Sequence, residues 1–107
     1  MQFLLLICND PTGEEFDPED NDIEKWLETV EGVRQEGNRL HPQSHARTVR
    51  RRKGKVLVTD GPYADTKERI GGFDLLDCDD IETAIDVASK HPMARFGCVE
   101  VRPIWPL

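Results

Sequence analysis

The sequence predicts an α+β sandwich in which two helices cover one face of an antiparallel sheet. Apolar runs and amphipathic segments follow one another as strand, helix, hairpin, strand, helix and strand, an order typical of a ferredoxin-like sandwich. The 107 residues suit one domain, and no linker or low-complexity tract divides them. We therefore expect residues 1–107 to form a single β-α-β-hairpin-β-α-β domain.

Three segments have the pattern of long strands. Residues 2–8 are apolar nearly throughout, as in a central strand that is covered on both faces. Residues 72–78 form the next apolar run, and residues 97–102 alternate between apolar and polar side chains. In a ferredoxin-like sheet the first strand lies between the other two and runs antiparallel to both. The end of the first strand should therefore meet the beginnings of the other two.

Two helices are predicted from their capping residues and their apolar spacing. Asp17 and Pro18 suit the start of the first, apolar residues then recur at helical spacing, and Gly37 is expected to end it. The second begins at a capping-box-like Asp79–Glu82 pair, and Pro92 stops it.

The predicted hairpin spans residues 46–59 and turns at Lys53-Gly54, where glycine tolerates a positive φ. Its turn carries the basic run Arg50–Lys53. This run reads either as an anion-binding patch or as a solvated hairpin tip without interleaved aromatic residues.

The net charge of −7 indicates an acidic surface, which repels phosphate backbones and argues against nucleic acid as a partner. No apolar run approaches the roughly 20 residues of a membrane helix. The opening apolar run is short and lacks a basic start, unlike a signal peptide. We therefore expect a cytoplasmic protein that does not enter membranes.

No motif indicates a metal ion or an organic cofactor. The three cysteines are far apart without a CxxC pair, and the spacing of His41 and His45 on non-helical backbone resembles no metal motif. We expect reduced thiols, although strand adjacency could bring Cys8 and Cys98 close together.

A long stretch resembles a known family. The residues "VTDGPYADTKERIGGFDLLDCDDIETAIDVA" with the closing "GCVEVRP" resemble the DGPF family of the broader YCII-related group, whose signature is "DGPFAETKE". Tyr63 stands where that signature has Phe, and Asp65 where it has Glu. The likeness extends to "MQFLLLICND" and "RTVRRRKGKVLVTDGP". It implies a dimeric α/β barrel of two ferredoxin-like protomers, and the uncovered sheet face independently predicts a homodimer.

The resemblance also implies a relation to small lyases and hydrolases with a His–Asp pair. In those relatives the histidine lies on the first helix, and the aspartate precedes a proline at the end of the second. Here the predicted first helix contains no histidine, and His91 stands before Pro92. We therefore do not transfer that mechanism.

The candidate site lies at one end of the predicted sheet, where Asn9, the 60–71 loop and His91 should meet. Carboxylates and an imidazole can transfer protons, a lysine can bind an anion, and a tyrosine offers an aromatic wall. The catalytic candidates are Asp60, Glu68 and His91. The ligand-binding candidates are Asp10, Tyr63, Lys67, Gly71 and Gly72.

Each candidate also has a structural interpretation. Asp60-Gly61-Pro62 suits a tight turn, Lys67 and Glu68 could pair across a dimer, and His91 could stabilise a helix end. Two functions therefore remain open. One is a small lyase or hydrolase acting on a small anionic metabolite. The other is a non-catalytic dimeric module for ligand sensing or a transcription-associated accessory role.

Overall fold

A computed structural model describes residues 1–64 and 68–106. It is an α+β structure with two antiparallel sheets, and its four-stranded main sheet has the order β2-β5-β1-β6. β1 lies between β5 and β6 and runs antiparallel to both, as predicted. This arrangement is compatible with a ferredoxin-like sandwich. The strands are β1 (Gln2–Asn9), β2 (Arg34–Arg39), β5 (Arg69–Asp77) and β6 (Gly97–Pro103).

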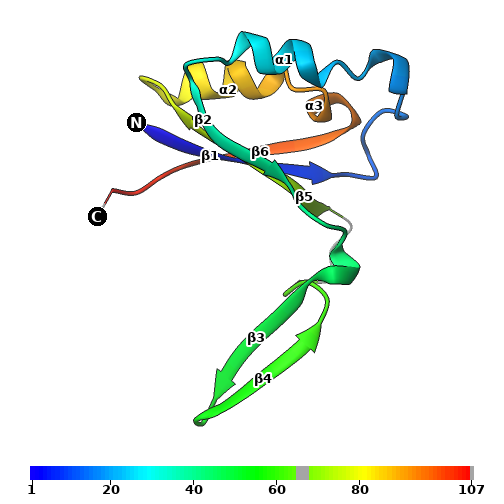
Figure 1. Ribbon diagram of the computed structural model, residues 1–107, viewed down its shortest axis with the longest axis vertical. Coiled ribbons are helices and arrows are strands. Elements are labelled where there is room, and N and C mark those ends of the chain that lie inside the picture. Colours follow the sequence, from blue (N-terminus) through cyan, green and yellow to red (C-terminus); the bar gives the residue numbers. More distant parts are fainter. Residues whose placement is uncertain (65–67, 107) are drawn as a thin grey trace.

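The helices lie together on one face of the main sheet (Figure 1). They are α1 (Ile23–Thr29), α2 (Ile81–Ser89) and the one-turn α3 (Met93–Phe96), with 3-10 turns at Pro18–Asp20 and Gln43–His45. Among the described residues, no helix has both the length and the apolar character needed to cross a membrane.

The predicted first helix is wrong in both of its bounds. Asp17 caps the short 3-10 turn instead, and α1 begins after Asp22, whose side chain accepts a hydrogen bond from the Lys25 N–H. The helix ends early because Gly32 adopts a φ of +86°, which reverses the chain. The following residues pair with β5 as the edge strand β2, so Gly37 lies within a strand.

The start of α2 also differs from the sequence prediction by one residue. Asp80, not Asp79, is the N-cap, and its carboxylate accepts hydrogen bonds from the Thr83 N–H (2.8 Å) and hydroxyl (2.6 Å). The aspartate with a threonine three residues later satisfies the first turn, so no reciprocal bond from Glu82 is needed. The end before Pro92 is as predicted.

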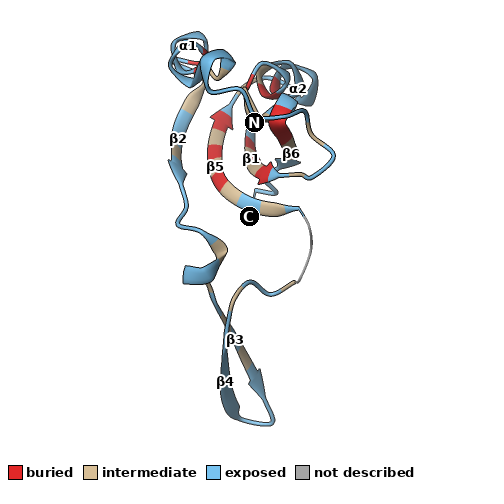
Figure 2. Ribbon diagram, turned by 90° about the vertical axis from the view of Figure 1, so that its right-hand side faces the viewer, coloured by how far each residue is buried: buried red, intermediate tan, exposed pale blue. Residues whose placement is uncertain are grey.

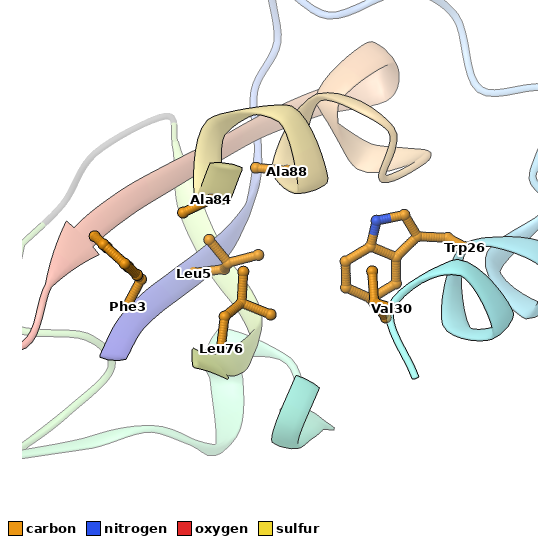
Figure 3. Close-up of a cluster of buried hydrophobic side chains, with 7 residues drawn as sticks. All are labelled: Phe3, Leu5, Trp26, Val30, Leu76, Ala84 and Ala88. Carbon is orange, nitrogen blue, oxygen red and sulfur yellow. The ribbon is translucent and has the colours of Figure 1, made fainter. Parts of the chain in front are cut away.

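The core lies between the main sheet and its helices (Figure 3). The indole N–H of Trp26 donates to the Val87 carbonyl over 2.9 Å, which joins α1 to α2. The sheet and the helices thus form one packed layer pair. Its buried residues are Phe3, Leu5, Trp26, Val30, Leu76, Ala84 and Ala88.

No described helix covers the other face of the main sheet (Figures 1 and 2). Cys8 and Cys98 stand directly opposite each other on β1 and β6, and both are free thiols. Burial, and then the neighbouring Cys98, raise the pKa of the Cys8 thiol to about 11. Cys8 is therefore protonated at neutral pH and a poor nucleophile.

The predicted hairpin forms as β3 (Arg47–Arg52) and β4 (Lys55–Asp60), but it is not part of the main sheet. Both turn residues, Lys53 and Gly54, have positive φ, as a tight two-residue hairpin turn requires. The hairpin projects away from the sheet on the side opposite the helices (Figures 1 and 2). We call residues 47–60 the arm. β2 therefore takes the sheet position that the sequence pattern gave to the hairpin.

Candidate functional site

A cleft of about 670 Å³ lies between α1 and the helix-covered face of the main sheet, and we call it the α1 cleft. Side chains of α1, β1 and β5 give it apolar walls, whereas β2 and the segment after it supply polar groups. Its lining residues are Ile7, Cys8, Asn9, Phe16, Asn21, Ile23, Trp26, Leu27, Arg34, Gly37, Asn38, Arg39, Leu40, His41, Pro42, Gln43, Gly71, Gly72, Phe73, Asp74, His91 and Met93.

An ion pair lies in the wall of the cleft. Arg34 Nε donates to Asp74 Oδ1 over 2.6 Å, and the Asp74 side chain is 8% exposed. The two residues come from neighbouring strands, β2 and β5. A buried carboxylate requires such a partner because desolvation of a lone charge is costly. Asp74 is the one carboxylate among the lining residues, and Arg34 compensates its charge.

Gly37 makes room for this ion pair. It stands directly opposite Asp74 in the β2–β5 register. A Cβ atom at Gly37 would lie 2.0 Å from Asp74 Oδ1 and 2.5 Å from an Arg34 guanidinium nitrogen. Any larger residue would therefore displace the carboxylate from the guanidinium.

His91 connects the end of α2 to the start of α3. It is 7% exposed, and its Nδ1 accepts a hydrogen bond from the Met93 N–H over 3.0 Å. Burial lowers the pKa of His91 below its ordinary value, with Asp74 opposing the shift. The ring is therefore neutral at pH 7, with its proton on Nε2 because Nδ1 is the acceptor.

The Nε2–H of His91 makes no hydrogen bond within the described residues. In this part of the chain, residues 1–64 and 68–106, no fully buried side-chain nitrogen or oxygen lacks a hydrogen-bond partner. Nε2 is therefore not fully buried, and His91 is one of the residues that line the α1 cleft. Trp26 holds the ring from the side, edge to face, with ring centroids 4.6 Å apart.

β2 and the segment after it make another part of the cleft polar and cationic. Arg39, at the end of β2, is exposed and has no carboxylate partner among the described residues. His41 follows it and stacks on His45 with ring centroids 4.9 Å apart. The cleft thus combines an apolar wall, a neutral imidazole donor and a guanidinium.

The structure brings some of the sequence candidates together. Asn9, Gly71, Gly72 and His91 all line the α1 cleft. A Cβ atom at Gly72 would lie 3.0 Å from the Asn38 carbonyl oxygen, so this glycine admits the neighbouring strand. Whether any of these residues contacts a ligand stays a prediction.

The remaining candidates lie outside the α1 cleft. Asp60 ends the arm, with its side chain 89% exposed and 3.1 Å from Arg47 Nε. Tyr63 and Glu68 line a separate groove of about 440 Å³ at the root of the arm. Asp10 accepts bonds from the Thr12 N–H (2.9 Å) and hydroxyl (2.7 Å), which lower its pKa. Lys67 lies outside the described residues.

Sequence reasoning missed Arg34, Gly37, Arg39 and Asp74 as site residues. Asp74 carried a signal, since it interrupts the apolar run from Gly72 to Leu76 at a position that alternation places on the buried face. Arg34 lies in the predicted first helix, Gly37 at its predicted end and Arg39 just beyond it. No group of three or more His, Cys, Asp or Glu side chains within the described residues could hold a metal ion.

Comparison of the sequence with known proteins identifies a family and a relative. The sequence profile described as "YCII-related domain" matches residues 1–107. An uncharacterised protein of Rhizobium meliloti (strain 1021) is 43% identical over 68 residues, which cover 62% of this chain and 55% of the relative. The match thus spans about half of that relative's length.

Proposed function

Because the chain belongs to the YCII-related family, we propose that it binds a small, partly apolar metabolite with an anionic group in the α1 cleft. The observation that carries this proposal is the pairing of a neutral imidazole donor, His91, with an uncompensated guanidinium, Arg39, along an apolar wall. Ligand sites of this kind are mostly apolar clefts with a few polar groups that orient the ligand.

The charges around the cleft favour an anion. Asp74 is neutralised by Arg34 at 2.6 Å, so the carboxylate of the cleft does not repel a negative group. Arg39 offers a planar set of donors that suits a carboxylate or a phosphate. The apolar wall, which includes Trp26 and Leu27, would hold the remainder of the ligand.

Two measurements test the proposal. A screen of small aromatic and aliphatic carboxylates by thermal shift, followed by calorimetry on the hits, should find ligands whose dissociation constant rises about tenfold in Arg39→Ala, the loss expected of one charged hydrogen bond. Arg102→Ala is the matched control, because Arg102 is an exposed arginine outside the cleft. Hits that bind Arg39→Ala and wild type equally would contradict the proposed site.

A lyase or hydrolase activity is a second candidate, favoured by the buried neutral His91. The Nε2–H of the neutral ring can donate a hydrogen bond that stabilises negative charge developing on a substrate oxygen, whereas Asp74 is held by Arg34 and is a poor base. Incubation of each hit with the protein, followed by mass spectrometry, separates the candidates. Turnover that is lost in His91→Gln supports catalysis, and an unchanged ligand supports sensing.

We also propose that the chain belongs to the DGPF subgroup of this family, because residues 60–68 resemble the DGPF signature.

A further inference from the structure

The arm exposes apolar side chains that nothing in the described chain covers. Val49, Val56 and Val58 are 65%, 56% and 60% exposed. The register pairs Val49 with Val58 and Arg51 with Val56, so the three valines share one face. Leu57 and Arg50 form a pair on the opposite face.

A free hairpin of this length is marginal. An isolated two-stranded sheet in water needs a third strand or a packed face for its stability. The arm also extends the molecule, whose radius of gyration of 15.8 Å exceeds the roughly 13 Å of a compact chain of this length. The valine face therefore indicates a missing partner.

The charges identify the chemistry of that partner. The hairpin carries no acidic residue from 47 to 55 but six cationic ones, namely Arg47, Arg50, Arg51, Arg52, Lys53 and Lys55. Residues 14–31 of the same chain carry one cationic residue, Lys25, against nine acidic ones, namely Glu14, Glu15, Asp17, Glu19, Asp20, Asp22, Glu24, Glu28 and Glu31. A second copy of this chain thus offers the complementary charge.

The position and length of the arm fit a second copy beneath the uncovered sheet face. The arm leaves the main sheet on the side opposite the helices (Figures 1 and 2). Its six-residue strands span about 20 Å at about 3.3 Å per residue. Two stacked sheets lie about 10 Å apart, and a helix layer lies about 10 Å further. The arm therefore passes a partner's sheet and reaches its helices.

The root of the arm forms a concave corner with the main sheet. The 440 Å³ groove in this corner is lined by Val49 together with Leu40, Tyr63 and Ile70. Tyr63 is 76% exposed there. Val49 belongs to both the groove and the valine face, so the apolar side chains of the groove adjoin the valine face.

We propose that the arm clasps a second copy of this chain. Its valine face packs on the sheet of the partner, and its basic turn lies on the acidic segment 14–31 of the partner, beside the partner's α1 cleft. Because Phe16, Asn21 and Ile23 of this segment line the cleft, the arm of one copy borders the ligand site of the other. The proposal does not depend on the identity of the ligand.

A charge exchange tests the clasp. Arg51→Glu/Arg52→Glu/Lys53→Glu reverses the arm, and Glu24→Lys/Glu28→Lys/Glu31→Lys reverses an exposed face of the acidic segment. Each variant alone should have a dimer dissociation constant at least tenfold above wild type by sedimentation equilibrium. Their mixture should form a heterodimer near wild-type affinity, because both contacts are restored. A mixture that associates no better than the separate variants would overturn the proposal, as would a monomeric wild type.

A pair of single substitutions tests the apolar face. Val58→Asp should raise the dimer dissociation constant at least about tenfold, as expected for a charge inside an interface. Leu57→Asp, on the opposite face beside Arg50, should change it less than twofold. Equal effects of the two would reject the face assignment. Circular dichroism at low concentration checks that the helices of each variant remain folded.

Nucleic acid is the competing occupant of a basic hairpin. Wild type and the arm-reversed variant are titrated into labelled single-stranded DNA at low and high salt. Weak binding of equal strength supports a protein partner. Tight, salt-sensitive binding by wild type that the reversal abolishes would overturn the clasp in favour of nucleic acid.

Discussion

Strands β4 and β5 carry similar aliphatic runs, and the structure uses them in opposite ways. Val56, Leu57 and Val58 of β4 are 56%, 47% and 60% exposed, whereas Leu76 of β5 is fully buried. β5 lies between two strands under a helix layer, and β4 pairs with β3 alone. An apolar run therefore indicates a strand that needs to be covered by other residues. The surrounding structure decides whether the same chain supplies these residues.

The two strands should differ most in how much the free energy of unfolding falls when one of their side chains is shortened to alanine. Leu76→Ala should lower the free energy of unfolding by about 4 kcal/mol, since it leaves a cavity in the core. Val58→Ala should cost less than about 0.5 kcal/mol in a dilute protomer, as surface changes do. Chemical denaturation measures both. An equal loss at low protein concentration would show that the arm packs within its own chain.

A smaller loss is expected from the glycine that accommodates the ion pair. Gly37→Ala should lower the free energy of unfolding by about 3 kcal/mol, because the new methyl group displaces Asp74 from Arg34. This value is near the lower end of the range for breaking a buried ion pair. Gly71→Ala is the matched control, since its Cβ would meet its nearest atom at 3.8 Å. An unchanged free energy of unfolding in Gly37→Ala would mean that the main sheet is less closely packed around the Arg34–Asp74 ion pair than the structure shows.

The smallest effect concerns pH and has no counterpart in the arm. Since the pKa of His91 is lower in the folded chain, its neutral form stabilises the fold above the unfolded pKa of about 6.5, and this stability is lost as pH falls through the folded pKa. His91→Asn, whose amide oxygen can accept the Met93 N–H, should lack this component of the pH profile of unfolding. The exposed His45→Asn should retain it.

The sequence was sufficient for the elements whose own residues determine them. The apolar run of β1, the alternation of β6 and the apolar stripe of α2 were interpreted correctly because burial imposes a period on each. The Lys53-Gly54 turn was also found, since few residues accept its backbone geometry. These features are local, and local pattern predicts them.

The sequence was insufficient where a residue depends on a distant partner. β2 reads "RQEGNR" without one apolar side chain, and its strand conformation comes from pairing with β5. In the sequence Gly37 resembles a helix terminus, and only the structure shows that it lies opposite Asp74. The predicted convergence at the end of β1 holds for Asn9 and His91, which line the same cleft, but not for Asp60, which lies on the arm.

The contact between Trp26 and His91 gives the protein an intrinsic optical probe. The indole of Trp26 is 3% exposed and lies 4.6 Å from the imidazole, while Trp105, the other tryptophan, is 89% exposed. Iodide should therefore quench Trp105 and spare Trp26, leaving a blue-shifted emission from beside the α1 cleft. A molecule that enters there would change this residual emission without any attached dye.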